Sequence, residues 1–335
     1  MTLLSVLDQS PVIAGHTAAD AIAATIELAQ LADDLGYTRY WCAEHHGLAG
    51  VCNPCPEVLL ARLGSVTKRI RIGSGGVMLP YYSPFKVAEQ FMMLEALFPN
   101  RIDLGVGRAP GGDMRTAQAV AAGEYNRGDI FAGQVRDLVG LMDGKLPAGH
   151  VAEGVVLQPQ VSTRPQLWVL GSSDFGGLLA AQLGLRFSFA HFINAHFGHL
   201  VTEAYRARFT AAHEAKPYLA AAVFVICADT DAQAADLEKA VDLRRVQMAY
   251  GLNAPIPSVA QGLSQEYGER ELLVIDREKP RSIIGTPQTV TERLVALQER
   301  FHADELIVLT VAGSYAARLR SYELLAEAFE LGRTA

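Results

Sequence analysis

The chain has few cysteines, no long apolar run and no excess of positive charge. Its 4 cysteines in 335 residues are too few for a disulfide framework. The longest uninterrupted apolar segment, residues 219–228, is much shorter than the roughly 20 residues that cross a bilayer. The first residues, MTLLSVLDQSP, lack the basic region with which a signal peptide begins. We therefore expect a cytoplasmic protein with no membrane partner.

The balance of charge and apolarity excludes two further classes. Asp and Glu (36) outnumber Lys and Arg (29), which gives a net charge of −7, so no basic stripe is available for a phosphate backbone and no nucleic-acid partner is expected. Half of the residues are hydrophobic and 19% are charged, a composition that excludes a disordered chain. A folded protein with a large core is expected.

Short apolar segments alternate with longer amphipathic ones along the whole chain. Eight of the short segments begin near residues 3, 38, 70, 101, 166, 186, 218 and 304, and they are apolar on both faces, as strands covered by helices are. Helix signals lie between them, such as the capping box of Thr17 and Asp20 and the Thr286-Pro287 pair. Eight strand–helix units predict one α/β domain over 1–335, a (β/α)8 TIM barrel.

The spacing of these segments predicts two insertions. The early strands follow one another every 31 to 35 residues, but the steps from 101 to 166 and from 218 to 304 are much longer. We expect insertions near 110–160, after the fourth strand, and near 250–285, after the seventh. The second contains Pro255, Pro257 and several charges, and is predicted to be a long loop or mobile lid. Two domains divided near 145–165 are the alternative.

In such a barrel, functional side chains follow the carboxyl ends of the strands. The second strand is followed by Glu44, His45 and His46, and a carboxylate beside imidazoles can act as a general acid or base near neutral pH. The structural alternative is a loop ordered by hydrogen-bonded histidines. His191, after the sixth strand, is expected to be structural.

Nearby cysteines suggest a metal site only weakly. Cys52 and Cys55 could join His45 and His46 as zinc ligands, but a second ligand pair at zinc-finger spacing is missing. No metal is expected, and we interpret the two cysteines as small buried thiols beside a turn.

The next three strand ends suggest a site for a flat anionic ligand. Gly75 and Gly76 follow the third strand and would let a flat ligand approach the backbone. Arg108 follows the fourth strand, and Ser172 and Ser173 open a helix after the fifth, where hydroxyls and free amides favour an anion. Because strands four and five are neighbours, the arginine and the serines could share one phosphate. A barrel bend, a surface salt bridge and a simple helix cap remain the structural alternatives.

The glycines around Arg108 do not form a dinucleotide fingerprint. The spacing G-x-G-x-x-G fails because position 110 is proline.

Taken together, these segments resemble the luciferase-like flavin-dependent monooxygenases, the superfamily of bacterial luciferase. The resemblance covers essentially the whole chain and is tightest over 38–113. The matching segments are AEHH at 43–46, IGSGGVMLP at 72–80, Pro84 with AEQ at 88–90, RIDLGVGR at 101–108 and GTP at 285–287.

The resemblance implies a TIM barrel, usually in a homo- or heterodimer, with reduced FMN across the barrel mouth. Reduced FMN would be a co-substrate supplied by a separate flavin reductase, and with O2 it would oxygenate a small organic molecule such as an aldehyde. A homodimer is expected here.

The resemblance also assigns roles to the candidate residues. Arg108 would hold the FMN phosphate with Ser172 and Ser173, and His45 would be the catalytic acid/base or orienting group, supported by Glu44 and His46. The peptide bond between Gly75 and Gly76 would face the flavin and be cis.

Two departures from the family pattern limit the resemblance. Gly107 stands where luciferase has a reactive cysteine, and residues 253–283 differ from the luciferase lid, so neither light emission nor the same aldehyde pocket is expected. Two alternatives stay open: a deazaflavin-dependent oxidoreductase that transfers hydride, and a non-catalytic flavin-binding protein.

Overall fold

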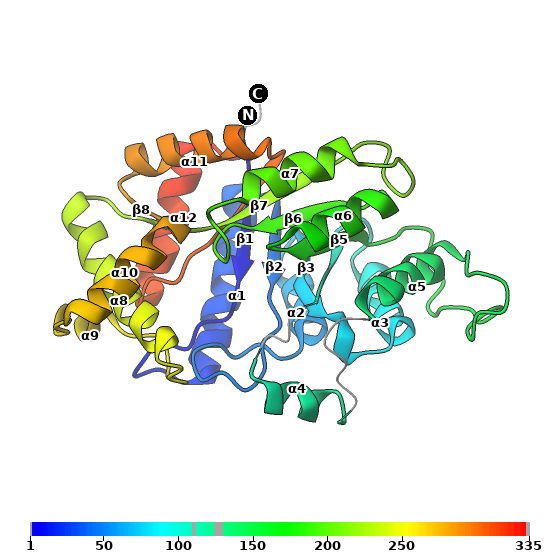
Figure 1. The fold of residues 1–335 in the computed structure, drawn as a ribbon, viewed down its shortest axis with the longest axis horizontal. Helices are drawn as coiled ribbons and strands as arrows, with labels where there is room; N and C mark the ends of the chain where they lie inside the picture. The colour runs from blue at the N-terminus through cyan, green and yellow to red at the C-terminus, as the bar shows by residue number, and fades with distance from the viewer. Residues whose placement is uncertain (1, 109–111, 124–129, 333–335) are drawn as a thin grey trace.

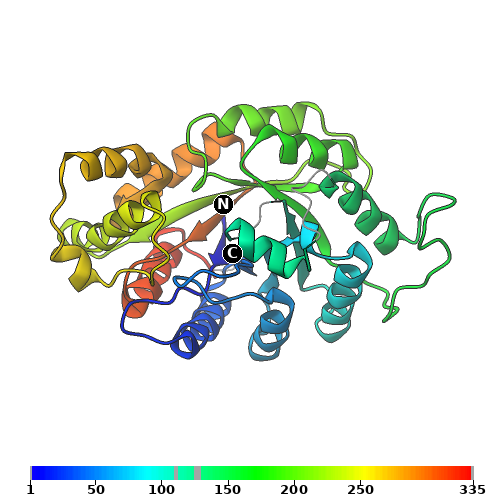
Figure 2. The same ribbon diagram turned by 60° about the horizontal axis from the view of Figure 1, so that its bottom comes forward.

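The fold is a closed parallel barrel surrounded by helices (Figures 1 and 2). The structure, a computed structural model, describes residues 2–108, 112–123 and 130–332. Eight strands close in the order β1–β2–β3–β4–β5–β6–β7–β9, and β9 pairs with β1 again. The bounds of the strands are β1 Leu3–Asp8, β2 Arg39–Cys42, β3 Arg71–Met78, β4 Ile102–Gly107, β5 Gln166–Gly171, β6 Arg186–Ala190, β7 Leu219–Cys227, β8 Ser282–Gly285 and β9 Glu305–Leu309. The predicted (β/α)8 barrel is confirmed.

The helices lie outside the barrel and begin where the sequence places caps. Thr17 and Asp20 form the predicted capping box of α1, and Gly36 ends that helix at φ 88°, a conformation that glycine adopts easily. The bounds of the helices are α1 Ala18–Leu35, α2 Pro56–Val66, α3 Pro84–Leu97, α4 Met114–Val120, α5 Phe131–Asp143, α6 Asp174–Leu183, α7 Gly198–Ala207, α8 Asp231–Ala249, α9 Val259–Leu263, α10 Glu269–Glu278, α11 Pro287–Phe301 and α12 Tyr315–Ala328. None of the helices in the described part of the chain is long and apolar enough to cross a membrane.

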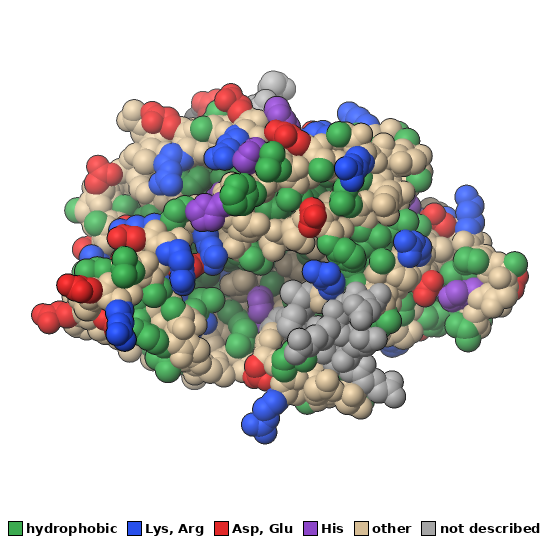
Figure 3. Space-filling model, in the orientation of Figure 1, with side chains coloured by type: hydrophobic (Ala, Val, Ile, Leu, Met, Phe, Trp, Pro, Cys, Tyr) green, Lys and Arg blue, Asp and Glu red, His purple; other side chains and the backbone are tan. Residues whose placement is uncertain are grey.

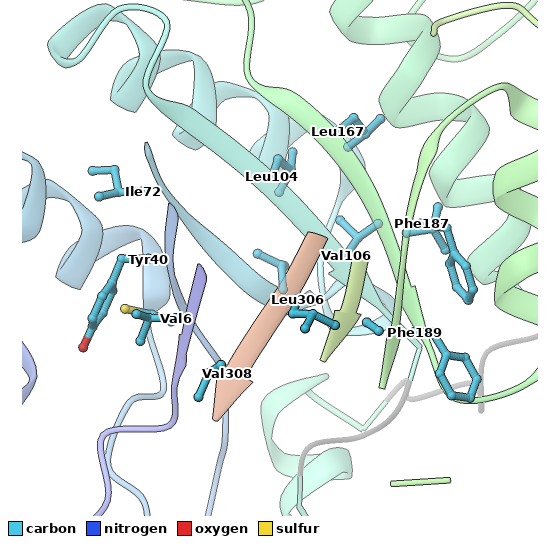
Figure 4. Packing of buried hydrophobic residues seen from close by; sticks show 14 of the residues in the cluster. Val6, Tyr40, Ile72, Leu104, Val106, Leu167, Phe187, Phe189, Leu306 and Val308 are labelled. Atoms are coloured by element: carbon cyan, nitrogen blue, oxygen red, sulfur yellow. The ribbon is translucent and has the colours of Figure 1, made fainter. Parts of the chain in front are cut away.

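Successive side chains along each strand point to opposite faces, which produces two apolar cores. Val6 and Val308 belong to the large cluster between the barrel and its helices, part of which is shown in Figure 4. Their neighbours Leu7 and Leu309 belong to a smaller cluster, with Trp41 and the residues Ala43, Trp168, Ala220, Ala222 and Ile307. Because both faces of each strand are apolar, the strands appear in the sequence as continuous apolar segments.

A network of charges fills the barrel near the amino ends of the strands. Arg39, at the start of β2, donates to Asp103 at 2.7 Å and to both carboxylate oxygens of Glu305 at 2.7 and 2.9 Å. Its guanidinium carbon also lies 4.8 Å from the ring centroid of Trp168. All of these side chains are buried. The network stabilises the end of the barrel opposite to the carboxyl ends of the strands, where the candidate site residues are expected.

The segment after β7 differs from its prediction. Residues 250–285 were expected to form a long loop or mobile lid, but they contain α9, α10 and a ninth strand, β8, which pairs in parallel with residues 224–227 of β7. The expectation of a loop is therefore wrong. The eight barrel strands are as predicted, and β8 is an additional strand attached to β7.

The other predicted insertion, near 110–160, holds α4 and α5. Part of this segment and Pro110 lie outside the described residues. On either side of it, β4 pairs directly with β5, so the barrel continues through the point where the two-domain alternative would divide the chain.

Candidate active site

The predicted site residues gather at the carboxyl ends of β2 to β5. Figure 3 shows this face hollowed near its centre, with hydrophobic side chains and a histidine inside the hollow and Lys or Arg side chains around it. Strand ends of a parallel barrel all point to one face, which is why residues from 44 to 173 can meet there.

His45 reaches a cavity of about 370 Å³ at this face. The backbone N–H of His45 donates to the carbonyl of Asn53 at 2.9 Å, and the Asn53 amide donates to the carbonyl of Ala43, which fixes the loop after β2. The Nδ1 atom of His45 is buried and has no hydrogen-bond partner in the described structure. Burial, with a smaller effect from His46, lowers the pKa of His45 to about 4. The imidazole is therefore neutral at pH 7.

Glu44 is the buried centre of a hydrogen-bond network behind His45. Its Oε1 accepts from the Tyr82 hydroxyl at 2.7 Å and lies 2.7 Å from His46 Nε2, and its Oε2 accepts from the backbone N–H of Met78 at 3.0 Å. Glu44 is only 1% exposed. This carboxylate therefore ties the loop after β2 to the end of β3, and it orients His46 instead of facing the cavity.

Arg108 packs on an aromatic residue in the first turn of α6, the helix that the two serines precede. The guanidinium carbon of Arg108 is 4.5 Å from the ring centroid of Phe175, in the first turn of α6, and Ser173 is the N-cap of that helix. The Ser173 side chain makes no capping hydrogen bond. Asn194 donates to the carbonyl of Ser172 at 3.0 Å and so holds the turn. The structure thus brings the predicted cation beside the predicted helix amino terminus.

The peptide bond between Gly75 and Gly76 is cis, as expected. A Cβ atom on Gly75 would lie 2.7 Å from Leu7 Cδ1, and one on Gly76 would lie 2.3 Å from Leu170 Cδ1 and 2.7 Å from the carbonyl oxygen of Gly105. The backbone of β4 therefore requires glycine at position 76, whereas at position 75 the closest contact is with a side-chain methyl group of Leu7.

His191 and the two cysteines lie apart from this network. His191 is buried against Phe301, with ring centroids 5.6 Å apart, and burial followed by nearby Arg300 lowers its pKa to about 4. Cys52 is half-buried, with its thiol 3.4 Å from the carbonyl oxygen of Ser10, and Cys55 is exposed. The interpretation of two buried thiols is therefore wrong for Cys55, because the turn before α2 leaves it at the surface.

Three residues of the candidate site were not predicted from the sequence. Tyr82 lies two residues after the segment 72–80, and Phe175 lies two residues after Ser173. In both cases an aromatic residue next to a predicted site segment could have indicated it. Arg244 lines the cavity from α8, where Val241, Arg244 and Met248 follow helical spacing and face the cavity together. That stripe was the signal for Arg244, but it lies on a helix and not at a strand end.

Comparisons with known proteins show the family of this chain. The family model described as luciferase-like monooxygenase matches residues 2–303. A luciferase-like monooxygenase of Escherichia coli (strain K12) is 36% identical over 96% of this chain and 95% of its own length. The N-acetyl-S-alkylcysteine monooxygenase of Bacillus subtilis (strain 168) is also 36% identical, over 98% of each chain.

Solved structures share the fold over almost the whole chain. Apo-MsnO8 is 37% identical and superposes with a TM-score of 0.91 over 99% of both chains. The oxygenating constituent of the 3,6-diketocamphane monooxygenase of Pseudomonas putida, in complex with FMN, is 20% identical (TM-score 0.72, 98% and 97% of the chains). An F420-dependent secondary alcohol dehydrogenase is 16% identical (TM-score 0.70, 98% of each chain). The last two similarities show the fold alone, whereas the family match and the closer relatives show that this chain belongs to the luciferase-like monooxygenase family.

Proposed function

We propose that this protein is an FMN-dependent monooxygenase that uses reduced FMN and O2 to oxygenate a small organic molecule such as an aldehyde. The observation that carries the proposal is the position of Arg108 over Phe175, beside the amino terminus of α6. A guanidinium next to a helix amino terminus is suited to a phosphate group, although the Phe175 amide of that turn already donates to Asp174 at 2.9 Å. Arg108, Ser172 and Ser173 would hold the FMN phosphate there.

The donors at this position fit a phosphate because they are available. No carboxylate among the described residues forms an ion pair with Arg108, whose side chain is exposed, and the Ser173 hydroxyl is not used as a cap. Between Arg108 and His45, the backbone of Gly75 and Gly76 would face the flavin ring. The unpartnered Nδ1 of His45 marks the reacting end of the site.

His45 would act on the organic substrate as a neutral base or as a hydrogen-bond donor. A neutral imidazole can accept a proton at its free nitrogen or donate one from the other, and burial keeps it neutral at working pH. Glu44 and His46 support its loop from behind. Reduced FMN, when bound, would supply the electrons that activate O2, and a separate flavin reductase would supply the reduced FMN.

Rapid mixing tests the proposal. Purified protein is mixed with reduced FMN and then with O2, and the absorbance of the flavin is followed during reoxidation. We expect slower reoxidation than for free FMN, with a transient spectrum that free FMN does not give, and turnover with added aldehydes. Reoxidation identical to that of free FMN contradicts the proposal.

Two further measurements separate the alternatives. A deazaflavin that displaces FMN and supports substrate reduction would indicate hydride transfer. Flavin binding with no turnover on a panel of aldehydes would indicate a binding protein. For His45→Gln we expect retained FMN affinity with lost turnover, and for the matched variant His191→Gln, at the end of β6, retention of both.

We also propose a homodimer. Val58 on α2 and Met93 and Leu97 on α3 are exposed apolar side chains on adjoining helices, a surface suited to a second copy. Light scattering after gel filtration tests this, and a monomer at micromolar concentration contradicts it.

A further inference from the structure

The cavity that His45 reaches is lined by three arginines from or near α8, and two of them are neutralised. Arg245 donates to Asp242 at 2.6 Å and to the hydroxyl of Ser282 at 2.5 Å. Arg281 forms an ion pair with Glu278 at 2.5 Å. Both of these charges are therefore compensated by the protein itself.

Arg244 is different, because the described residues offer its charge no carboxylate. Among the described residues, its one hydrogen bond runs from Nη1 to the carbonyl oxygen of Ala254, at 3.1 Å. The Nη2 atom of Arg244 lies close to Gly50. A Cβ atom on residue 50 would be only 3.2 Å from this nitrogen. Nε and Nη2 thus remain available as donors at the wall of the cavity. Burial lowers the pKa of Arg244.

The rest of the cavity is mainly apolar. Leu48 and Val51 come from the loop after β2, Phe192 follows β6, and Met248 lies one turn beyond Arg244 on α8. The volume of about 370 Å³ corresponds to roughly a dozen water-sized groups at about 30 Å³ each. The cavity therefore suits a small organic molecule with an extended apolar part.

We propose that this cavity binds a carboxylate-bearing organic substrate, with Arg244 as the anchor of the carboxylate and the apolar walls around the chain that links it to the reacting carbon near His45. The inference rests on the proposed function and narrows its substrate class from small organic molecules in general to organic acids. An arginine fork that lacks an acidic partner gains a bidentate, charge-assisted contact from such a ligand, and an uncharged analogue leaves the fork unpaired.

Binding of matched acids and amides to the flavin-free protein tests this inference. Hexanoate and octanoate are compared with hexanamide and octanamide by calorimetry at pH 7.5, so that each pair differs in charge with the same chain. We expect at least one acid to bind about tenfold or more tightly than its amide, the factor given by one charge-assisted contact. Equal affinity for acid and amide at both chain lengths, or no binding of either acid at 10 mM, overturns the inference.

Variants assign the preference to one side chain. Arg244→Gln should abolish the preference for the acid while changing amide affinity less than about threefold, and Arg244→Lys should keep part of it because the charge remains. Arg281→Gln is the matched control, since it removes the same charge from the same cavity but from a neutralised pair, and it should weaken acid binding less than threefold. Equal losses in R244Q and R281Q, or loss of acid and amide together in both Arg244 variants, contradict a carboxylate anchor.

FMN titrations in parallel keep the two proposals apart. R244Q should bind FMN as the unmodified protein does, because Arg108 lies at the other predicted subsite. A protein that prefers acids but does not bind FMN contradicts the proposed function alone, and one that binds FMN without preferring acids contradicts this inference alone.

Discussion

Arg108 lies over the ring of Phe175, with its guanidinium carbon 4.5 Å from the ring centroid. The contact joins the end of β4 to the first turn of α6, the two places from which phosphate donors were expected. A cation held on an aromatic face keeps its N–H groups directed outward, where an anion can accept from them.

Replacing Arg108 should therefore weaken the binding of a phosphorylated flavin. For Arg108→Ala we expect a loss of about 2–4 kcal/mol in FMN binding, because a charge-assisted contact disappears. Riboflavin, which has the same ring and no phosphate, should bind both forms equally. Fluorescence titration with the two flavins measures this difference.

A nearby arginine provides the control for this prediction. Arg115 is exposed, on α4, and Arg115→Ala should leave FMN affinity within about twofold. If R108A and R115A have the same effect, or if R108A changes FMN affinity by less than a few-fold, Arg108 does not bind the phosphate.

Glu44 accepts hydrogen bonds from a side chain and a backbone amide while lying against His46, so its replacement should destabilise the loop after β2. Glu44→Gln keeps the shape but presents an amide group where Met78 N–H or the Tyr82 hydroxyl donates. One unsatisfied buried donor costs about 1–3 kcal/mol. Urea unfolding should show this loss.

Glu89 on α3 serves as the comparison for Glu44. It lies 3.7 Å from Lys86 at the surface of the helix, and E89Q should change the free energy of unfolding by less than about 0.5 kcal/mol. Equal stability of E44Q and the unmodified protein would mean that the network around Glu44 contributes nothing to the fold.

The fold was predictable because both faces of the barrel strands are buried. Each of the eight predicted segments begins within one residue of an observed strand, from β1 to β7 and at β9. The missed strand, β8, has only four residues and pairs with the last part of β7 alone. The prolines before α9 favoured the expectation of a loop over this whole segment.

The candidate site was predictable only where it follows the strands. The rule that function lies at the carboxyl ends of barrel strands pointed to the candidates His45, Arg108 and Ser173. It could not locate Arg244, because α8 carries that residue over the barrel mouth from outside the sheet. The same rule could not separate His45, which reaches the cavity, from Glu44, which is turned into a buried network.

Two neutral histidines, the half-buried His45 and the buried His191, should make stability depend on pH. His45 and His191 have pKa values lowered to about 4, against 6.5 for a free side chain. Between pH 6.5 and pH 4 the unfolded chain binds protons that the folded protein does not, so the free energy of unfolding falls as the pH falls through this window. Each histidine contributes up to roughly 3 kcal/mol to this loss. Urea unfolding at pH 7.5, 6.0 and 5.0 measures it.

Single substitutions should separate the two contributions. His45→Gln and His191→Gln should each flatten the pH dependence between 6.5 and 5, and the double variant should flatten it further. His16, an exposed histidine before α1, provides the control substitution. An unchanged slope in both single variants would show that neither ring is buried in its neutral form.

Arg39 should be essential for stability and irrelevant to flavin binding. It is 2% exposed and neutralises Asp103 and Glu305 at the amino end of the barrel, so Arg39→Met leaves excess negative charge in the interior. Breaking a buried pair in this way costs about 3–5 kcal/mol.

Arg39→Lys keeps the charge but loses the fork that reaches both carboxylates, and should cost less. Urea unfolding measures both losses, and FMN titration of the folded variants should give unchanged affinity, because the proposed phosphate donors lie at the opposite end of the strands. A loss of FMN affinity in folded R39K would mean that the two ends of the barrel are coupled.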